Sequence, residues 1–153
     1  AFNNAVKSNH FHAEARKGLA EAFRLKGEEE RYLKYMNEAA YIYALQDNME
    51  GVKDLFIGVL KDYPDVANPY NPLGVVLRQK KDYKGALHAY NRALEVTPDD
   101  ETVHFNLGKV YWAMHRYLRA VKSLEKALEL KPDFDEAQKL LDVVRVKYAS
   151  LKT

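Results

Sequence analysis

The strongest constraint on this chain is a pattern that returns with a constant period of 34 along the sequence. Segments that end at Pro64, Pro98 and Pro132 align at this spacing, and each has two apolar residues five and four positions before its proline. A period of roughly 20–50 residues is typical of repeat proteins, in which each repeat buries an apolar face against the next one. The other positions that keep the step are Leu73-Gly74 with Leu107-Gly108, Tyr83 with Tyr117, Val52 with Ala86 and Ala120, and Phe56 with Tyr90 and Leu124.

The apolar positions predict two amphipathic helices in each repeat, with small residues where the two helices cross. Gly74 and Gly108 each cost about 1 kcal/mol of helix propensity, so we expect a neighbouring helix to approach them closely. Each proline is expected to end the second helix of its repeat. Acidic residues such as Asp100 follow, where they suit the start of the next helix. The sequence therefore predicts about eight helices and no strand.

This pattern resembles the tetratricopeptide repeat, which runs aromatic, Leu-Gly, Tyr, Ala, aromatic and a closing Pro over about 34 residues. Residues 67–100 match best, with Tyr70, Leu73-Gly74, Tyr83, Ala86, Tyr90, Ala93 and Pro98. Residues 101–134 are nearly as good, and residues 33–66 are a weaker copy. The resemblance covers nearly the whole chain. It implies one all-α domain over residues 1–153, a right-handed α-solenoid of antiparallel helix pairs.

The register changes upstream of residue 33. A repeat over residues 13–46 overlaps the repeat over 33–66, so we expect the helix at Glu29–Leu45 to serve both. Residues 1–12 read as the remnant of an upstream repeat, with His10-Phe11-His12 in a loop, and residues 135–153 read as a capping helix. We interpret the chain as a fragment of a longer repeat-containing protein.

Composition excludes several functions. The net charge is only +2 and the signs are interleaved, which disfavours nucleic acid as a partner. No apolar run approaches the roughly 20 residues that span a bilayer, so membrane insertion is not expected. The chain has no cysteine, and its histidines lack a third ligand nearby, so no metal or other cofactor is expected. No nucleophile, phosphate loop or dinucleotide motif supports an enzyme.

The resemblance implies a protein–protein interaction module whose first helices line a concave groove. Asparagines there can bind a peptide backbone, and the basic residues suit an acidic or C-terminal segment. A chaperone-tail clamp is disfavoured because Glu21 stands where its asparagine belongs. The groove residues that helical periodicity selects are Asn37, Tyr41, Asn71, Val75, Arg78, Gln79, Phe105, Asn106, Lys109 and Trp112.

Two further expectations concern local structure and assembly. Pro72 should occupy the first turn of a helix that begins at residue 71 or 72. Phe2, Ala5 and Val6 lack a partner helix, so a homodimer is expected, if at all, through the N-terminal end of the chain, between positions 1 and 30. The alternative function is a structural scaffold that self-associates or stacks on other repeats to build an assembly.

Overall fold

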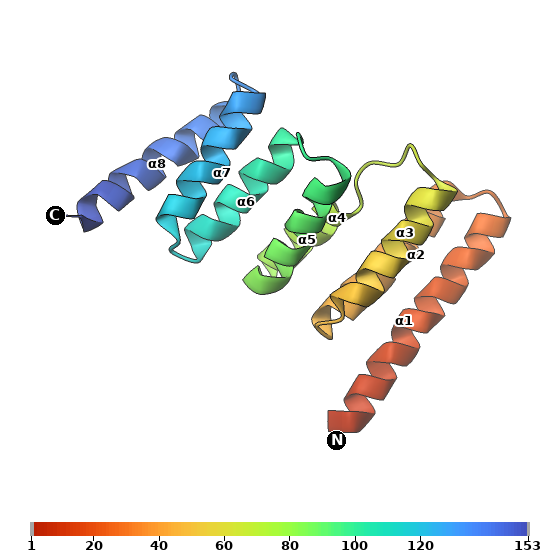
Figure 1. Cartoon of the computed structure of the whole chain (residues 1–153). Helices are drawn as coiled ribbons and strands as arrows, with labels where there is room; N and C mark the ends of the chain where they lie inside the picture. The colour runs from red at the N-terminus through yellow and green to blue at the C-terminus, as the bar shows by residue number, and fades with distance from the viewer. Residues whose placement is uncertain (1, 153) are drawn as a thin grey trace. The chain divides into compact units, whose positions relative to one another are not determined.

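The structure, a computed structural model, describes the backbone of residues 2–152 and the side chains of residues 11–152. Within that part of the chain every regular element is a helix, and no strand occurs (Figure 1). The helices are α1 (Phe2–Leu25), α2 (Glu29–Leu45), α3 (Met49–Asp62), α4 (Tyr70–Gln79), α5 (Tyr83–Val96), α6 (Glu101–Ala113), α7 (Tyr117–Leu130) and α8 (Asp135–Leu151).

The helices form two compact units, Ala1–Pro69 and Tyr70–Thr153. In the first unit α2 contacts both α1 and α3. In the second unit each helix from α4 to α8 packs against the next one in the chain. The division of the chain into individual repeats stays a prediction.

The turn that follows the first helix of a pair has one conformation throughout. Gly27, Asp47, Lys81 and His115 all have positive φ angles, between 57° and 74°. In each turn the next residue donates its backbone N–H to the carbonyl five residues earlier, as Arg116 does to Tyr111 at 2.9 Å. This is the Schellman ending of a helix. It occurs at both ends of α2, so that helix follows one such turn and precedes another.

The second helix of each pair ends before a proline, as expected. Thr97, which precedes Pro98, donates its N–H to the carbonyl of Ala93 at 2.9 Å. Asp100 then caps α6 by accepting bonds from the N–H groups of Thr102 and Val103 at 3.0 and 3.2 Å. The acid at this helix start therefore acts as an N-cap, which satisfies two backbone donors.

The contact glycines are confirmed. A Cβ atom at Gly108 would lie 2.7 Å from Cδ2 of Leu124, and one at Gly74 would overlap the ring of Tyr90. Both neighbours are fully buried on the second helix of the same pair. The cost of glycine in a helix is thus offset by close helix packing.

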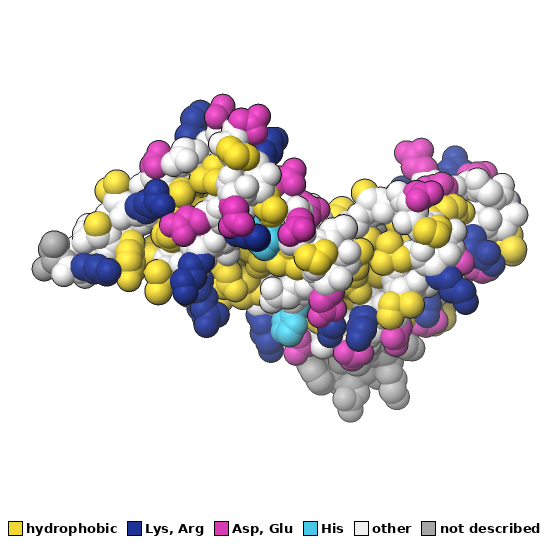
Figure 2. Space-filling model, turned by 45° about the horizontal axis from the view of Figure 1, so that its top comes forward, with side chains coloured by type: hydrophobic (Ala, Val, Ile, Leu, Met, Phe, Trp, Pro, Cys, Tyr) yellow, Lys and Arg dark blue, Asp and Glu magenta, His cyan; other side chains and the backbone are white. Residues whose placement is uncertain are grey.

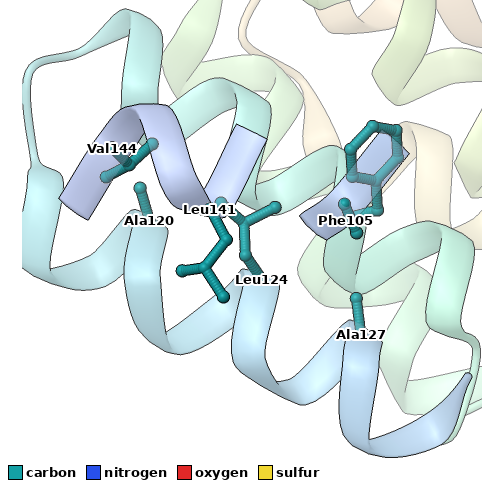
Figure 3. Close-up of a cluster of buried hydrophobic side chains, with 7 residues drawn as sticks. Phe105, Ala120, Leu124, Ala127, Leu141 and Val144 are labelled. Atoms are coloured by element: carbon teal, nitrogen blue, oxygen red, sulfur yellow. The ribbon is translucent and has the colours of Figure 1, made fainter. Parts of the chain in front are cut away.

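The core at the C-terminal end of the second unit joins α6, α7 and α8. Leu124 on α7 faces Leu141 on α8, and Ala120 lies beside Val144 (Figure 3). Phe105 of α6 completes this cluster, with its ring 4.8 Å from that of Phe134. These contacts make α8 a packed member of the unit.

Two local expectations need correction. The helix containing Pro72 begins at Tyr70, one residue earlier than predicted. Pro72 still lies in the first turn, where the backbone N–H that it lacks has no partner within the helix. The loop expected at His10-Phe11-His12 is wrong, because α1 runs without a break from Phe2 to Leu25. Nothing in these residues breaks a helix, since neither proline nor glycine occurs before Gly18. The side chains of Phe2, Ala5 and Val6 lie outside the described residues.

Candidate interaction surface

The predicted groove residues belong to different units. Asn37 and Tyr41 lie on α2 in the first unit, where Asn37 is exposed and Tyr41 is half-buried. The other predicted residues lie on α4 and α6 in the second unit, and those two helices contact each other. The geometry of the candidate surface is therefore described for α4 and α6.

A pair of asparagines links the two helices. Asn106 on α6 is buried, and its Nδ2 atom donates a hydrogen bond of 2.9 Å to Oδ1 of Asn71 on α4. A buried amide must be hydrogen-bonded, because an unpaired one costs about 1–3 kcal/mol. This bond holds the first helices of two successive pairs together, and it occupies one oxygen and one nitrogen that the sequence analysis had assigned to a partner.

Two cations lie close together one to two turns farther along the same helices. Lys109 has a lowered pKa, because burial disfavours its charge and the charge of Arg78 adds repulsion, while Glu136 acts weakly in the opposite direction. Arg78 makes no salt bridge with any described residue, and its Nε atom is buried without a hydrogen-bond partner. Like charges held close together favour the binding of an anion.

Aromatic rings surround these cations. The Lys109 ammonium lies 4.5 Å from the centre of the Phe105 ring, which is itself in the core. The ring of Trp112 packs at 5.4 Å against that of Tyr117, so this tryptophan is half-buried. Beneath Arg78, Tyr90 is fully buried and its hydroxyl has no partner among the described residues. Burial raises the pKa of Tyr90 to about 12, and the charge of Arg78 partly opposes that rise.

The predicted residues therefore fall into two groups. Phe105 and Asn106 are buried and can only form the floor of a site, whereas Val75, Arg78, Lys109 and Trp112 are partly exposed and Gln79 is exposed. Neither Tyr90 nor Glu136 is predicted from the sequence to act on this surface. The repeat pattern marks Tyr90 as a core position, and only the structure places its hydroxyl near Arg78.

No helix in the described part of the chain is both long and apolar enough to cross a membrane. Among the same residues, no three histidine, aspartate or glutamate side chains gather as a metal site would require. The side chain of His10 lies outside this search.

Two family models match the chain, both for the tetratricopeptide repeat. One covers residues 74–114 and the other residues 102–134. Solved structures agree with this assignment. The Arabidopsis OM64 TPR domain superposes with a TM-score of 0.55 at 15% identity over 91% of this chain and 98% of that one. MamA from Desulfovibrio magneticus gives 0.53 at 21% identity, over 92% of this chain and 88% of that one.

These matches support a tetratricopeptide repeat protein, with the repeat matched over residues 74–134, and the described part of the chain has an all-α helical repeat fold of the solenoid class, as the sequence predicts. Proteins with this repeat are protein–protein interaction modules, and the same general role holds for this chain.

Curated relatives match only parts of the chain. The human protein O-mannosyl-transferase TMTC3 is 32% identical over 85 residues, which are 56% of this chain and 9% of that protein. Superkiller protein 3 of Saccharomyces cerevisiae is 26% identical over 133 residues, 83% of this chain and 9% of that protein. A Giardia intestinalis N-acetylglucosaminyltransferase is 32% identical over 71 residues, 46% of this chain and 5% of that protein. The chain thus spans less than a tenth of these relatives, and likeness to two transferases does not establish whether it is an enzyme.

Proposed function

We propose that the second unit binds an acidic or C-terminal segment of a partner protein on the surface of α4 and α6. Arg78 and Lys109 hold carboxylates, Val75 and Trp112 contact the apolar parts of the segment, and Gln79 contacts its backbone. Asn71 and Asn106 fix the two helices beneath it, with Phe105 as part of the floor. In the first unit, Asn37 and Tyr41 offer a further polar and aromatic pair to a partner. The chain acts by binding and carries out no reaction of its own.

The observation that carries this proposal is the pair of neighbouring cations Arg78 and Lys109, neither of which forms a salt bridge with a described residue. Burial is the larger cause of the lowered pKa of Lys109, and a partner carboxylate near both cations offsets the second cause, which is the repulsion by Arg78. Charge-assisted bonds of this kind are among the stronger polar contacts in protein interfaces.

The test uses charge reversal on the whole chain. The double variant Arg78→Glu, Lys109→Glu should weaken binding of a peptide of repeated Glu-Ala pairs by about tenfold or more, measured by fluorescence anisotropy at about 0.15 M salt. The control variant Lys122→Glu, Lys139→Glu makes the same change in net charge at two exposed lysines elsewhere in the unit. Equal binding by the two double variants would remove the proposal.

The alternative, a scaffold that self-associates, is supported by exposed apolar side chains at both ends. Phe11 and Leu25 on α1 are 70% and 76% exposed, and Val146 on α8 is 73% exposed. Dimerisation through the N-terminal end would use α1, and stacking in an assembly would use α8. Sedimentation separates the two, because a dimer lost on Leu25→Lys uses α1 and one lost on Val146→Lys uses α8.

A further inference from the structure

A second concave site lies in the same unit, at residues that the proposed function does not use. It has a volume of about 610 Å³ and is formed by the turn before α7, the first turn of α7 and the last turn of α8. This volume is within the range of ligand-binding pockets, which is roughly 300–1,000 Å³. We call this site the α7–α8 pocket.

The charge of the α7–α8 pocket is entirely positive. Arg116, Arg119 and Lys152 line it, and no aspartate or glutamate does. None of the three makes a salt bridge with a described residue, although basic side chains elsewhere in the chain do, as Arg145 does with Glu125 at 2.9 Å. Arg119 and Lys152 instead lie over the rings of Tyr111 and Tyr148, at 5.9 and 4.5 Å from their centres. The charges are therefore available to an anion.

Two leucines and a tyrosine supply an apolar part of the pocket. Leu118 and Leu151 line it while remaining 50% and 59% exposed, and the half-buried ring of Tyr148 lies between the two helices that carry them. Figure 2 shows hydrophobic and basic side chains next to one another towards the C-terminal end of α8. Leucine side chains this exposed in a concave site gain free energy when a ligand covers them, at roughly 25 cal/mol per Å² of apolar surface.

His115 fixes the wall of the pocket. Its backbone is in the left-handed region, with φ of 60°, and Nδ1 of its ring is 2.9 Å from the hydroxyl of Tyr117. Tyr117 packs in turn against Trp112. Arg116 and Leu118 are therefore held on a rigid turn, and a rigid site loses less conformational entropy on binding than a mobile one.

We infer that the α7–α8 pocket is a second docking site, which takes a short segment of a partner protein in which a leucine or aromatic side chain is flanked by aspartate or glutamate. The apolar side chain covers Leu118 and Leu151, and the flanking carboxylates pair with Arg116, Arg119 and Lys152. An inorganic phosphate would leave the leucines uncovered.

The test measures binding of the labelled peptide Asp-Glu-Leu-Phe-Asp-Glu to the whole chain at about 0.15 M salt, where unspecific attraction is screened beyond about 8 Å. The neutral peptide Asn-Gln-Leu-Phe-Asn-Gln and the polar peptide Asp-Glu-Ser-Ser-Asp-Glu should each bind about tenfold more weakly, because each lacks one half of the recognised chemistry. Equal affinity for all three peptides, or no saturable binding of the first at millimolar concentration, would overturn the inference.

Variants then locate the site. The double variant Arg116→Glu, Arg119→Glu should lose at least about tenfold in affinity, and Leu118→Gln should lose several-fold. The matched control is Lys122→Glu, Lys139→Glu, on the same two helices but not lining the pocket, which should bind like the unmodified chain. All substituted side chains are exposed, and circular dichroism melts verify that each variant folds.

The variant Arg78→Glu, Lys109→Glu keeps this test independent of the proposed function. Peptide binding that survives this change but not Arg116→Glu, Arg119→Glu supports the pocket even if the α4–α6 surface proves inert. The reverse result would overturn the pocket and leave the proposed function intact. Two other results would also overturn the inference if the peptide does not bind. Binding of phosphatidylserine vesicles that depends on Arg116 and Arg119 would indicate a membrane surface as the ligand. Self-association that depends on the same residues would indicate a second copy of the chain.

Discussion

The two units of this chain build the same kind of helix pair from different residues. In the second unit, glycines at the helix crossings touch the partner helix, as Gly108 touches Leu124. In the first unit, the crossing positions are fully buried alanines such as Ala20 and Ala40, while the helical glycines Gly18 and Gly58 face open space. The close approach of helices in the second unit thus depends on glycine, which has no Cβ atom. In the first unit the helices pack against alanine at these positions.

The two units also differ in the hydrogen bonds of their buried tyrosines. In the first unit, buried tyrosines bond to carboxylates on other helices: the hydroxyl of Tyr32 donates to Asp62 at 3.1 Å and that of Tyr43 to Glu14 at 2.5 Å. In the second unit Tyr90 is buried without a hydroxyl partner.

The spacing of the turns differs as well. The step from Gly27 to Asp47 is shorter than the steps from Asp47 to Lys81 and from Lys81 to His115, which are equal to each other and to the period of the repeat. All four residues nevertheless share the same left-handed backbone conformation. A helical repeat can therefore keep its turn geometry while it changes both its period and its packing.

The largest expected difference in stability is between alanine substitutions at a glycine of the second unit and at one of the first. Gly108→Ala should lower the free energy of unfolding by about 1–3 kcal/mol, because the added methyl overlaps a fully buried leucine. Gly58→Ala in the first unit should raise it by up to about 1 kcal/mol, since alanine favours the helix and meets no neighbour. Urea denaturation followed by circular dichroism measures both. A stabilising effect of Gly108→Ala would mean that the close approach is not needed.

The turn that both units share allows a finer comparison. Gly27→Ala should cost about 1 kcal/mol, because an L-residue is strained at the φ of 74° found there. Lys81→Gly, at the equivalent turn of the second unit, should be neutral or slightly stabilising, because glycine removes a strain that lysine now bears. The thermal midpoint should fall for Gly27→Ala, and for Lys81→Gly it should stay unchanged or rise. Equal destabilisation by both changes would contradict a common turn conformation.

The smallest expected difference in stability is between phenylalanine substitutions at the buried tyrosines of the two units. Tyr32→Phe should cost about 1 kcal/mol, because it removes a hydrogen bond to a charged group, and Tyr90→Phe should stay within about 0.5 kcal/mol. The pH dependence gives a second readout. Burial raises the pKa of Tyr90 to about 12, above the value of about 10 expected when unfolded, so its neutral form stabilises the fold fully below pH 10. That contribution is lost between pH 10 and 12.

As the pH rises through this range, the free energy of unfolding should therefore decrease less for the Tyr90→Phe variant than for the unmodified chain. The comparison uses urea denaturation at a series of pH values from about 9 to about 12. An unchanged pH slope would mean that the Tyr90 hydroxyl is solvated in the folded state.

The sequence alone predicted the helices after residue 28, the prolines that follow the second helices and the two contact glycines, but it did not predict the unbroken helix over residues 2–25. The period of 34, the closing prolines and the two contact glycines are local signals, and they depend only on backbone geometry and on the spacing of apolar residues along one helix. For the candidate surface the same reasoning selected residues on α2, α4 and α6, but it could not separate buried residues from exposed ones. Phe105 and Asn106 follow the helical period as well as Lys109 does, yet they are buried.

Only the tertiary structure decided which polar groups meet. The bond between Asn71 and Asn106 joins residues 35 positions apart, and the α7–α8 pocket joins a turn near residue 116 to the end of a helix near residue 151. Such pairings depend on the angle and separation at which two helices pack, which no periodicity within either helix records. The sequence gives no reason to single out the exposed residues at the start of α7, which include Arg116, Leu118 and Arg119. They become a candidate site only because the last turn of α8 packs beside them.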